Sequence, residues 1–187
     1  MLRLVTGGSG SGKSRYAEDQ LLSLGQRKRY YIATMIPWDE ECRSRIGRHR
    51  QMRAGKGFET VECPVDLGRL ELEEGSAVLL ECLSNLTANE FFREERAGMS
   101  REERKAGTRE EILAGIRRIA DRAGEVTVVT NEIFSDGTAY DPDTTDYLEV
   151  LGQLNEALAR EAGEVTEVVF GIPVRIKTED FRGRWER

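Results

Sequence analysis

Short apolar runs alternate with amphipathic stretches along this chain, and the two periods predict strands that alternate with helices. The expected strands are rich in β-branched and aromatic residues and cover residues 1–6, 29–34, 58–62, 77–81, 126–130, 165–170 and 174–177. Helices are expected at residues 12–25, 39–54, 83–92 and 112–123, and along the leucines 148, 151, 154 and 158. Alternating strands and helices form a mainly parallel sheet with helices on both faces, so we expect an α/β fold.

Residues 93–111 break this pattern, because 12 of these 19 residues are charged. A segment of that composition cannot form a core, so we expect an exposed connection. Thr108 and Glu111 have the spacing of a capping box, in which a Ser or Thr and a Glu three residues later open a helix. We therefore expect the next helix to begin at residue 112.

Composition restricts the kind of protein. A chain of 187 residues is long enough for one α/β domain spanning residues 1–187, and no apolar run approaches the ~20 residues of a membrane span. A glycine-rich stretch at residues 7–14, described below, follows the first residues so closely that we expect no signal peptide and a cytoplasmic protein. Cys42, Cys63 and Cys82 are widely spaced, which favours reduced thiols over disulfides or zinc. A net charge of −6 argues against nucleic acid as the main partner.

A glycine-rich stretch after the first predicted strand fits the phosphate-binding pattern of Gly, four free positions and Gly-Lys-Ser. Its residues are Gly7, Gly8, Ser9, Gly10, Ser11, Gly12, Lys13 and Ser14. We expect Gly8 and Gly10 to help turn backbone N–H groups toward a phosphate, Lys13 to reach the β- and γ-phosphates, and Ser14 to bind Mg²⁺. A flexible Gly/Ser turn is disfavoured by the strand before it and the helix after it. The fold should therefore resemble that of P-loop NTPases.

Polar residues at the ends of other strands are expected to meet this loop, because ligands of such sheets bind at the carboxyl ends of strands. They are Thr34, Glu62, Glu81, Asn131 and Glu132. Glu81 ends a buried strand, where phosphate-loop enzymes place the acid that orders Mg²⁺. A solvated acid at a strand end is the alternative.

The predicted helix at 39–54 changes sign after its acidic start, for which Asp39 is the expected N-cap. Its later part and the following turn carry six basic residues and no acid, namely Arg43, Arg45, Arg48, Arg50, Arg53 and Lys56. Like charges on one helix repel, so an anionic ligand is expected, with a solvated face as the alternative. His49, the only histidine, lies among them. A neutral imidazole there could act as a nucleophile toward a phosphorus atom, although a lone surface histidine is more often inert.

These stretches, in this order, resemble the bifunctional adenosylcobinamide kinase and adenosylcobinamide-phosphate guanylyltransferase family of cobalamin assembly. The resemblance covers nearly the whole chain. Besides the phosphate loop it rests on residues 31–34, 59–62, 79–83 and 129–132, on Asn89, Asn155 and 171–173, and most specifically on Arg45-Ile46-x-x-His49-Arg50-x-x-Arg53.

The resemblance implies phosphorylation of cobinamide by ATP or GTP with Mg²⁺, then transfer of GMP from GTP through a covalent bond to His49. It implies nucleotide contacts from Ala33, Thr34, Met35, Arg50, Arg53, Glu62 and Glu81, a metal held by Ser14 and Glu81, and a homotrimer. The chain departs from the family pattern around Asn85 and over residues 134–142, which we expect to face the corrinoid. A monofunctional kinase with an idle His49, or a nucleotide-binding regulatory module that uses residues 93–111 as a partner surface, are the alternatives.

Overall fold

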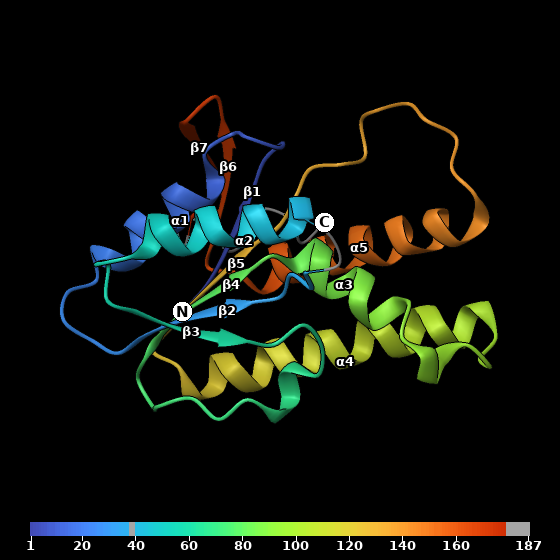
Figure 1. Cartoon of the computed structure of the whole chain (residues 1–187), viewed down its shortest axis with the longest axis horizontal. Helices are drawn as coiled ribbons and strands as arrows, with labels where there is room; N and C mark the ends of the chain where they lie inside the picture. The colour runs from blue at the N-terminus through green and yellow to red at the C-terminus, as the bar shows by residue number, and fades with distance from the viewer. Residues whose placement is uncertain (38–39, 179–187) are drawn as a thin grey trace.

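A mainly parallel β-sheet forms the centre of the computed structural model, which describes residues 1–37 and 40–178 (Figure 1). In this part of the chain seven strands pair in the order β3-β2-β4-β5-β1-β6-β7, and only β7 runs antiparallel to its neighbour. The strands are β1 (Leu2–Thr6), β2 (Arg29–Ala33), β3 (Phe58–Glu62), β4 (Ala77–Glu81), β5 (Glu125–Val129), β6 (Glu164–Val169) and β7 (Ile172–Lys177). The expected α/β fold is confirmed.

Helices connect these strands on both faces of the sheet. They are α1 (Lys13–Leu22), α2 (Glu40–Arg53), α3 (Leu83–Phe91), α4 (Arg101–Arg122) and α5 (Pro142–Glu161), with short 3₁₀ turns η1 (Leu67–Arg69) and η2 (Glu94–Arg96). Within the described residues no helix has the length and apolar character needed to cross a bilayer.

Alternate residues of the central strands enter two different cores. Leu4 and Ile32 face a large cluster formed with α3, α4 and α5, whereas their neighbours Val5 and Tyr31 face a smaller cluster formed with α1. This alternation follows from the two-residue period of a strand. The helix that follows the phosphate loop, α1, therefore packs on the face of the sheet opposite to α3, α4 and α5.

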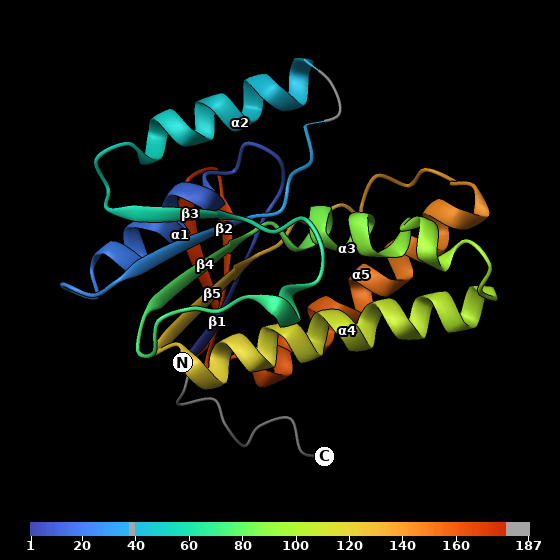
Figure 2. The ribbon, with the colours of Figure 1, turned by 60° about the horizontal axis from the view of Figure 1, so that its bottom comes forward.

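Helix α2 stands off the sheet, above α1 and the edge strand β3 (Figure 2). None of its described side chains belongs to either core cluster. The side chains at positions 41, 42, 45, 48, 49, 52 and 53 lie outside the described part, as does Asp39, the expected N-cap. Among the described side chains of α2, Arg50 joins the helix to the edge of the sheet through an ion pair with Glu62 at the end of β3.

The expected exposed connection at residues 93–111 is found only up to residue 100, and the expectation was wrong for residues 101–111, which are helical. Helix α4 begins at Arg101, and Ser100 and Glu103 form its capping box. The Ser100 N–H donates a hydrogen bond to the Glu103 carboxylate, and the Glu103 N–H donates one to the Ser100 hydroxyl. Thr108, the expected cap, instead lies within α4, and it is fully buried. Arg96 is also buried, between Glu90 and Glu111, so this charged segment does contribute to the interior.

Two basic residues of this segment form ion pairs with acids of α5. Arg101 donates two hydrogen bonds of 2.7 Å to the two oxygens of Asp146, and the Lys105 ammonium lies 3.1 Å from a Glu149 oxygen. These pairs join residues more than forty positions apart in sequence. Long-range charge pairing therefore accompanies about three additional turns of helix where composition alone indicated a connection.

Candidate active site

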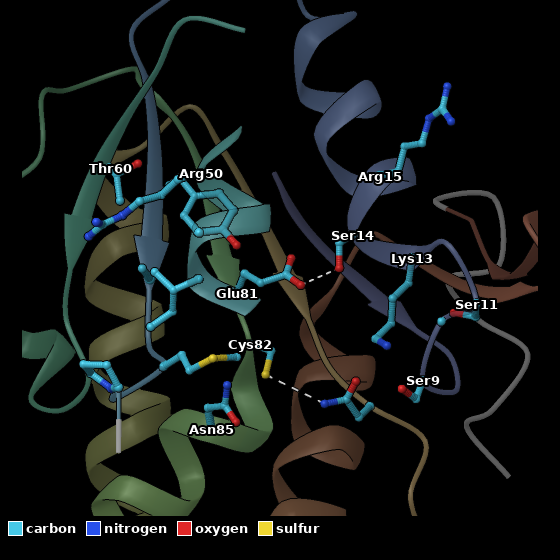
Figure 3. Close-up of a pocket in the computed structure, with 18 of the residues that line it drawn as sticks. Ser9, Ser11, Lys13, Ser14, Arg15, Arg50, Thr60, Glu81, Cys82 and Asn85 are labelled. Atoms are coloured by element: carbon cyan, nitrogen blue, oxygen red, sulfur yellow. Dashed lines mark hydrogen bonds between the residues drawn. The ribbon is translucent and has the colours of Figure 1, made fainter. Parts of the chain in front are cut away.

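A cavity of about 780 Å³ opens at the carboxyl ends of the parallel strands, below α2. One wall is the phosphate loop from Ser9 to Ser14, and another is formed by the ends of β2, β3 and β4. Helix α2 contributes Arg43, Ile46, Gly47 and Arg50. Figure 3 shows side chains from these elements pointing into one space. The edge of the sheet predicted to bind a ligand is thus the edge that contains the cavity.

The phosphate loop is closed on itself. The Lys13 ammonium donates a 3.0 Å hydrogen bond to the Gly8 carbonyl, and the Ser11 N–H donates to the same carbonyl at 3.2 Å. Lys13 lies at the first position of α1, where unpaired N–H groups and the helix dipole favour an anion. The loop therefore presents a cation and a helix N-terminus to the cavity.

Two glycines of the loop are required by geometry. A Cβ at Gly7 would lie 2.5 Å from the Val168 carbonyl oxygen, and Gly12 has a φ of +92° that side chains rarely adopt. Gly10 also has a positive φ, of +70°, as its expected role demands. Gly8 has no positive φ and has open space beside it, so the expected conformational role of Gly8 was wrong.

Ser14 and Glu81 lie together at the floor of the cavity. The Ser14 hydroxyl donates a hydrogen bond to the Glu81 carboxylate, between the start of α1 and the end of β4 (Figure 3). Hydroxyl and carboxylate oxygens are the protein groups that bind Mg²⁺ together with nucleotide phosphates. The donor set therefore fits a Mg²⁺ ion shared with a bound nucleotide.

Ala33 and Met35 line the cavity, but Thr34 between them lies behind it. The fully buried Thr34 hydroxyl lies 3.0 Å and 2.9 Å from the carbonyl oxygens of Glu81 and Cys82, and accepts a 2.8 Å hydrogen bond from the Cys82 N–H. The Asn89 amide in turn donates to the Thr34 carbonyl at 2.8 Å. Thr34 thus holds the backbone that carries Glu81, a role that its position at a strand end did not reveal.

Two of the predicted nucleotide contacts are paired with each other. The Arg50 guanidinium of α2 forms an ion pair with Glu62 at the end of β3, and both residues line the cavity. Lys56, just after α2, forms a 2.6 Å ion pair with the buried carboxylate of Glu18 on α1. His49 and Arg53 belong to α2, but their side chains lie outside the described part of the chain. The basic residues of the described part of this wall are Arg43 and Arg50, and Arg50 is balanced by Glu62.

The wall opposite α2 consists of Asn85, Cys82, Asn131 and Ile133. The Asn131 amide donates a 2.6 Å hydrogen bond to the Ser84 hydroxyl, which orients it at the end of β5 between the phosphate loop and Glu81. Burial and the neighbouring Glu81 carboxylate raise the pKa of the Cys82 thiol, so Cys82 is not a nucleophile at neutral pH.

Glu132 does not line the cavity, contrary to expectation. Its carboxylate accepts hydrogen bonds from the Phe134 N–H at 3.0 Å and the Ser135 hydroxyl at 2.9 Å. Asn85 and Ile133 are cavity residues that motif reasoning did not place there. In the sequence, the only signal that singled out these two positions was that the chain departs from the family pattern near them.

A phosphate loop at the end of β1, with a serine–carboxylate pair beside it in a mainly parallel sheet, defines a P-loop nucleotide-binding protein. The chain belongs to the cobinamide kinase / cobinamide phosphate guanyltransferase family, whose model matches residues 3–176. It is 34% identical to the bifunctional adenosylcobalamin biosynthesis protein CobU of Salmonella typhimurium, over 95% of this chain and 100% of that protein. It is 33% identical to CobU of Escherichia coli, over 95% and 100%, and 31% identical to CobP of Pseudomonas aeruginosa, over 96% and 99%.

Proposed function

We propose that this protein phosphorylates adenosylcobinamide with a nucleoside triphosphate and then transfers GMP from GTP to the new phosphate. Membership of the family and the bifunctional relatives support both activities. The observation that carries the proposal is the arrangement of the cavity, in which Lys13, Ser14 and Glu81 lie on the floor and the basic helix α2 forms a wall. A triphosphate needs cationic groups on more than one side, and this cavity supplies them.

In the kinase step a hydroxyl oxygen of cobinamide attacks the γ-phosphorus, the bond to the β–γ bridging oxygen breaks, and the hydroxyl proton is released. Lys13 stabilises the negative charge that spreads over the phosphoryl oxygens, turning from the Gly8 carbonyl to the nucleotide. Ser14 and Glu81 would hold Mg²⁺, which supplies charge neutralisation at the β- and γ-phosphates when bound. Positioning and electrostatics account for most of the rate in such reactions.

In the guanylyl step a neutral nitrogen of His49 attacks the α-phosphorus of GTP, and pyrophosphate leaves. An oxygen of cobinamide phosphate then attacks the same phosphorus, the P–N bond breaks, and His49 is regenerated. The cavity-lining residues Ile46 and Arg50 flank His49 in sequence on α2, which supports this role. Arg43 and Arg50 provide positive charge for the triphosphate and the departing pyrophosphate.

We also propose a homotrimer, as the family resemblance suggested. The β6–β7 hairpin supports an interface, because its apolar side chains Phe170, Ile172, Val174 and Ile176 are between 47% and 94% exposed. Exposed apolar edge strands are usually covered by a partner. A monomer in sedimentation equilibrium at micromolar concentration would contradict this part of the proposal.

The test is labelling with α-labelled GTP and Mg²⁺ in the absence of corrinoid. Wild-type protein should retain label and release pyrophosphate, because the first half-reaction needs no acceptor, and the bond should resist alkali and break in acid. His49→Ala should lose labelling and keep cobinamide phosphorylation, whereas Gln51→Ala, an exposed neighbour on α2, should keep both. Equal labelling of wild type and His49→Ala would exclude the covalent intermediate at His49. Absence of labelling in a protein that phosphorylates cobinamide would leave a monofunctional kinase.

A further inference from the structure

A buried ion pair joins the turn after α2 to the phosphate-loop helix α1. The Lys56 ammonium donates a 2.6 Å hydrogen bond to a carboxylate oxygen of Glu18. The Glu18 side chain is 1% exposed and that of Lys56 is 25% exposed. A carboxylate at this depth costs free energy unless a cation pairs with it, and breaking such a pair leaves the charge uncompensated. Glu18 therefore holds the Lys56 ammonium in one place.

Two glycines shape the turn that carries Lys56. Gly55 has a φ of +83° and Gly57 a φ of +71°, in the left-handed region that other residues rarely adopt. Between them the chain leaves α2, which ends at Arg53, and approaches β3, which begins at Phe58. Helix α2 lies above α1 in Figure 2, so a side chain from this turn can reach the helix beneath it. Lys56 thus connects the end of α2 with α1.

We propose that Lys56 is a positioning residue for guanylyl transfer, because its ion pair with Glu18 fixes the C-terminal end of α2 relative to the phosphate loop. The inference rests on the proposed function and adds the contact that places the backbone of His49. Glu18 lies four residues after Ser14 on α1, so the two side chains share one face of that helix. The pair therefore connects the helix that carries His49 with the helix whose first turn lines the cavity.

The ion pair between Arg50 and Glu62 is a weaker anchor for α2. Its side chains are 58% and 66% exposed, and exposed pairs contribute little to stability. Both residues line the cavity and are proposed to contact the nucleotide, so a bound nucleotide competes with their pairing. The described residues that line the cavity do not include Lys56 or Glu18. Their pair is therefore independent of nucleotide binding.

The two proposed reactions depend on α2 to different degrees. The kinase step uses Lys13, Ser14 and Glu81, which belong to α1 and β4. The guanylyl step needs a nucleophile from α2 beside the α-phosphorus. Reacting atoms must lie about 3–3.5 Å apart, and a misplacement of about 1 Å can lower a rate about 100-fold. Loss of the Lys56 pair should therefore slow guanylyl transfer far more than phosphorylation.

The test removes the ion pair without leaving a buried charge unpaired. The double variant Glu18→Gln with Lys56→Met loses both charges. Its matched control is Lys28→Met with Glu59→Gln, which removes the more exposed pair beside β2 and β3. We expect labelling by α-labelled GTP to slow about 10- to 100-fold in the first double variant at saturating GTP, with kcat for cobinamide phosphorylation and KM for ATP within about twofold of wild type. The control should change neither reaction.

Two further measurements separate positioning from general stability. Lys56→Arg keeps a cation beside Glu18 and should label within about threefold of wild type. Backbone amides of α2 should exchange with deuterium faster in the first double variant, while those of α4 keep their wild-type rates. Together these results would show that the cation of Lys56 fixes α2.

Three results would overturn the proposal. They are unchanged labelling in the first double variant, equal losses of labelling and phosphorylation, and a Lys56→Arg variant that labels as slowly as the double variant. The second of these would show that the pair only stabilises α1. Wild-type protein that is never labelled by GTP would refute the guanylyl step of the proposed function itself, which is a different result from labelled wild type with an unaffected double variant.

Discussion

Replacing Thr34 with valine tests whether a buried hydroxyl positions the metal-binding carboxylate. Valine has nearly the same shape but cannot hydrogen-bond, so the variant removes the contacts of the Thr34 hydroxyl with the backbone of Glu81 and Cys82. Thr34 is fully buried and Cys82 is buried, so water cannot replace these bonds. Thr34→Ser is the matched control, because it keeps the hydroxyl and loses only a methyl group.

The size of the effect follows from the hydrogen bonds that valine cannot make. Leaving the Cys82 N–H unsatisfied costs about 1–3 kcal/mol and losing the hydroxyl's own donated bond about 1 kcal/mol more, while the extra methyl of valine returns about 0.8 kcal/mol. The net loss of about 1–3 kcal/mol lowers the melting temperature by roughly 3–10 °C for a chain of this size. Because the backbone of Glu81 loses a fixed support, we also expect kinase activity to fall about 10- to 100-fold, as for other residues that orient metal ligands.

The assay is kinase activity against Mg²⁺ concentration at a temperature where both variants are folded. Thr34→Val should need more Mg²⁺ for half-maximal activity, whereas Thr34→Ser should follow the wild type. A valine variant that melts lower but keeps the wild-type Mg²⁺ dependence would show that Thr34 has only a structural role, and the reasoning about Glu81 would be refuted.

Three further predictions concern other parts of the molecule. Lys13→Ala should abolish cobinamide phosphorylation and leave the circular dichroism spectrum and melting temperature nearly unchanged, because Lys13 faces the cavity; phosphorylation near the wild-type rate would contradict the site. Ser100→Ala should cost about 1 kcal/mol in urea unfolding as an N-cap loss, whereas Thr108→Val should cost nothing, since the buried Thr108 hydroxyl has no hydrogen-bond partner in the described part of the chain. Arg101 lowers the pKa of Asp146, so the stability that this pair supplies is present above the ordinary Asp pKa near ~3.9 and is lost as pH falls through the lowered folded value. Arg101→Ala should therefore melt below wild type at pH 7, and the difference should vanish in acid; a constant difference would contradict this sign.

The sheet was predictable because its strands are short buried runs. Residues 77–81 were expected where β4 occurs, since apolar side chains with no polar interruption leave little choice of boundary, and residues 58–62 were expected where the more exposed edge strand β3 occurs. The start of α4 was not predictable. Ser100-Arg-Glu-Glu and Thr108-Arg-Glu-Glu are the same local signal, and the choice between them is made by acids of α5. Local patterns do not contain that information.

The candidate site also contains residues that could be predicted from the sequence and residues that could not. The phosphate loop and Glu81 were found from spacing, because the backbone geometry that binds phosphate demands particular residues at fixed intervals. Thr34 was expected to contact nucleotide, but in the structure it faces the protein interior. The residue after a strand can turn to either side, and sequence alone does not fix which. Asn85 and Ile133 reach the cavity only because α3 begins and β5 ends beside it.

The unequal size of the two cores has a consequence for local opening. The phosphate-loop helix α1 is held by the smaller cluster, whereas α3, α4 and α5 share the larger one. Regions with less buried apolar surface open more readily to solvent, so backbone amides of α1 should exchange with deuterium sooner than those of α4. A nucleotide bound at the start of α1 stabilises only the closed form and would slow that exchange by mass action. Amide protection of α1 would then report nucleotide occupancy without any corrinoid or catalytic turnover.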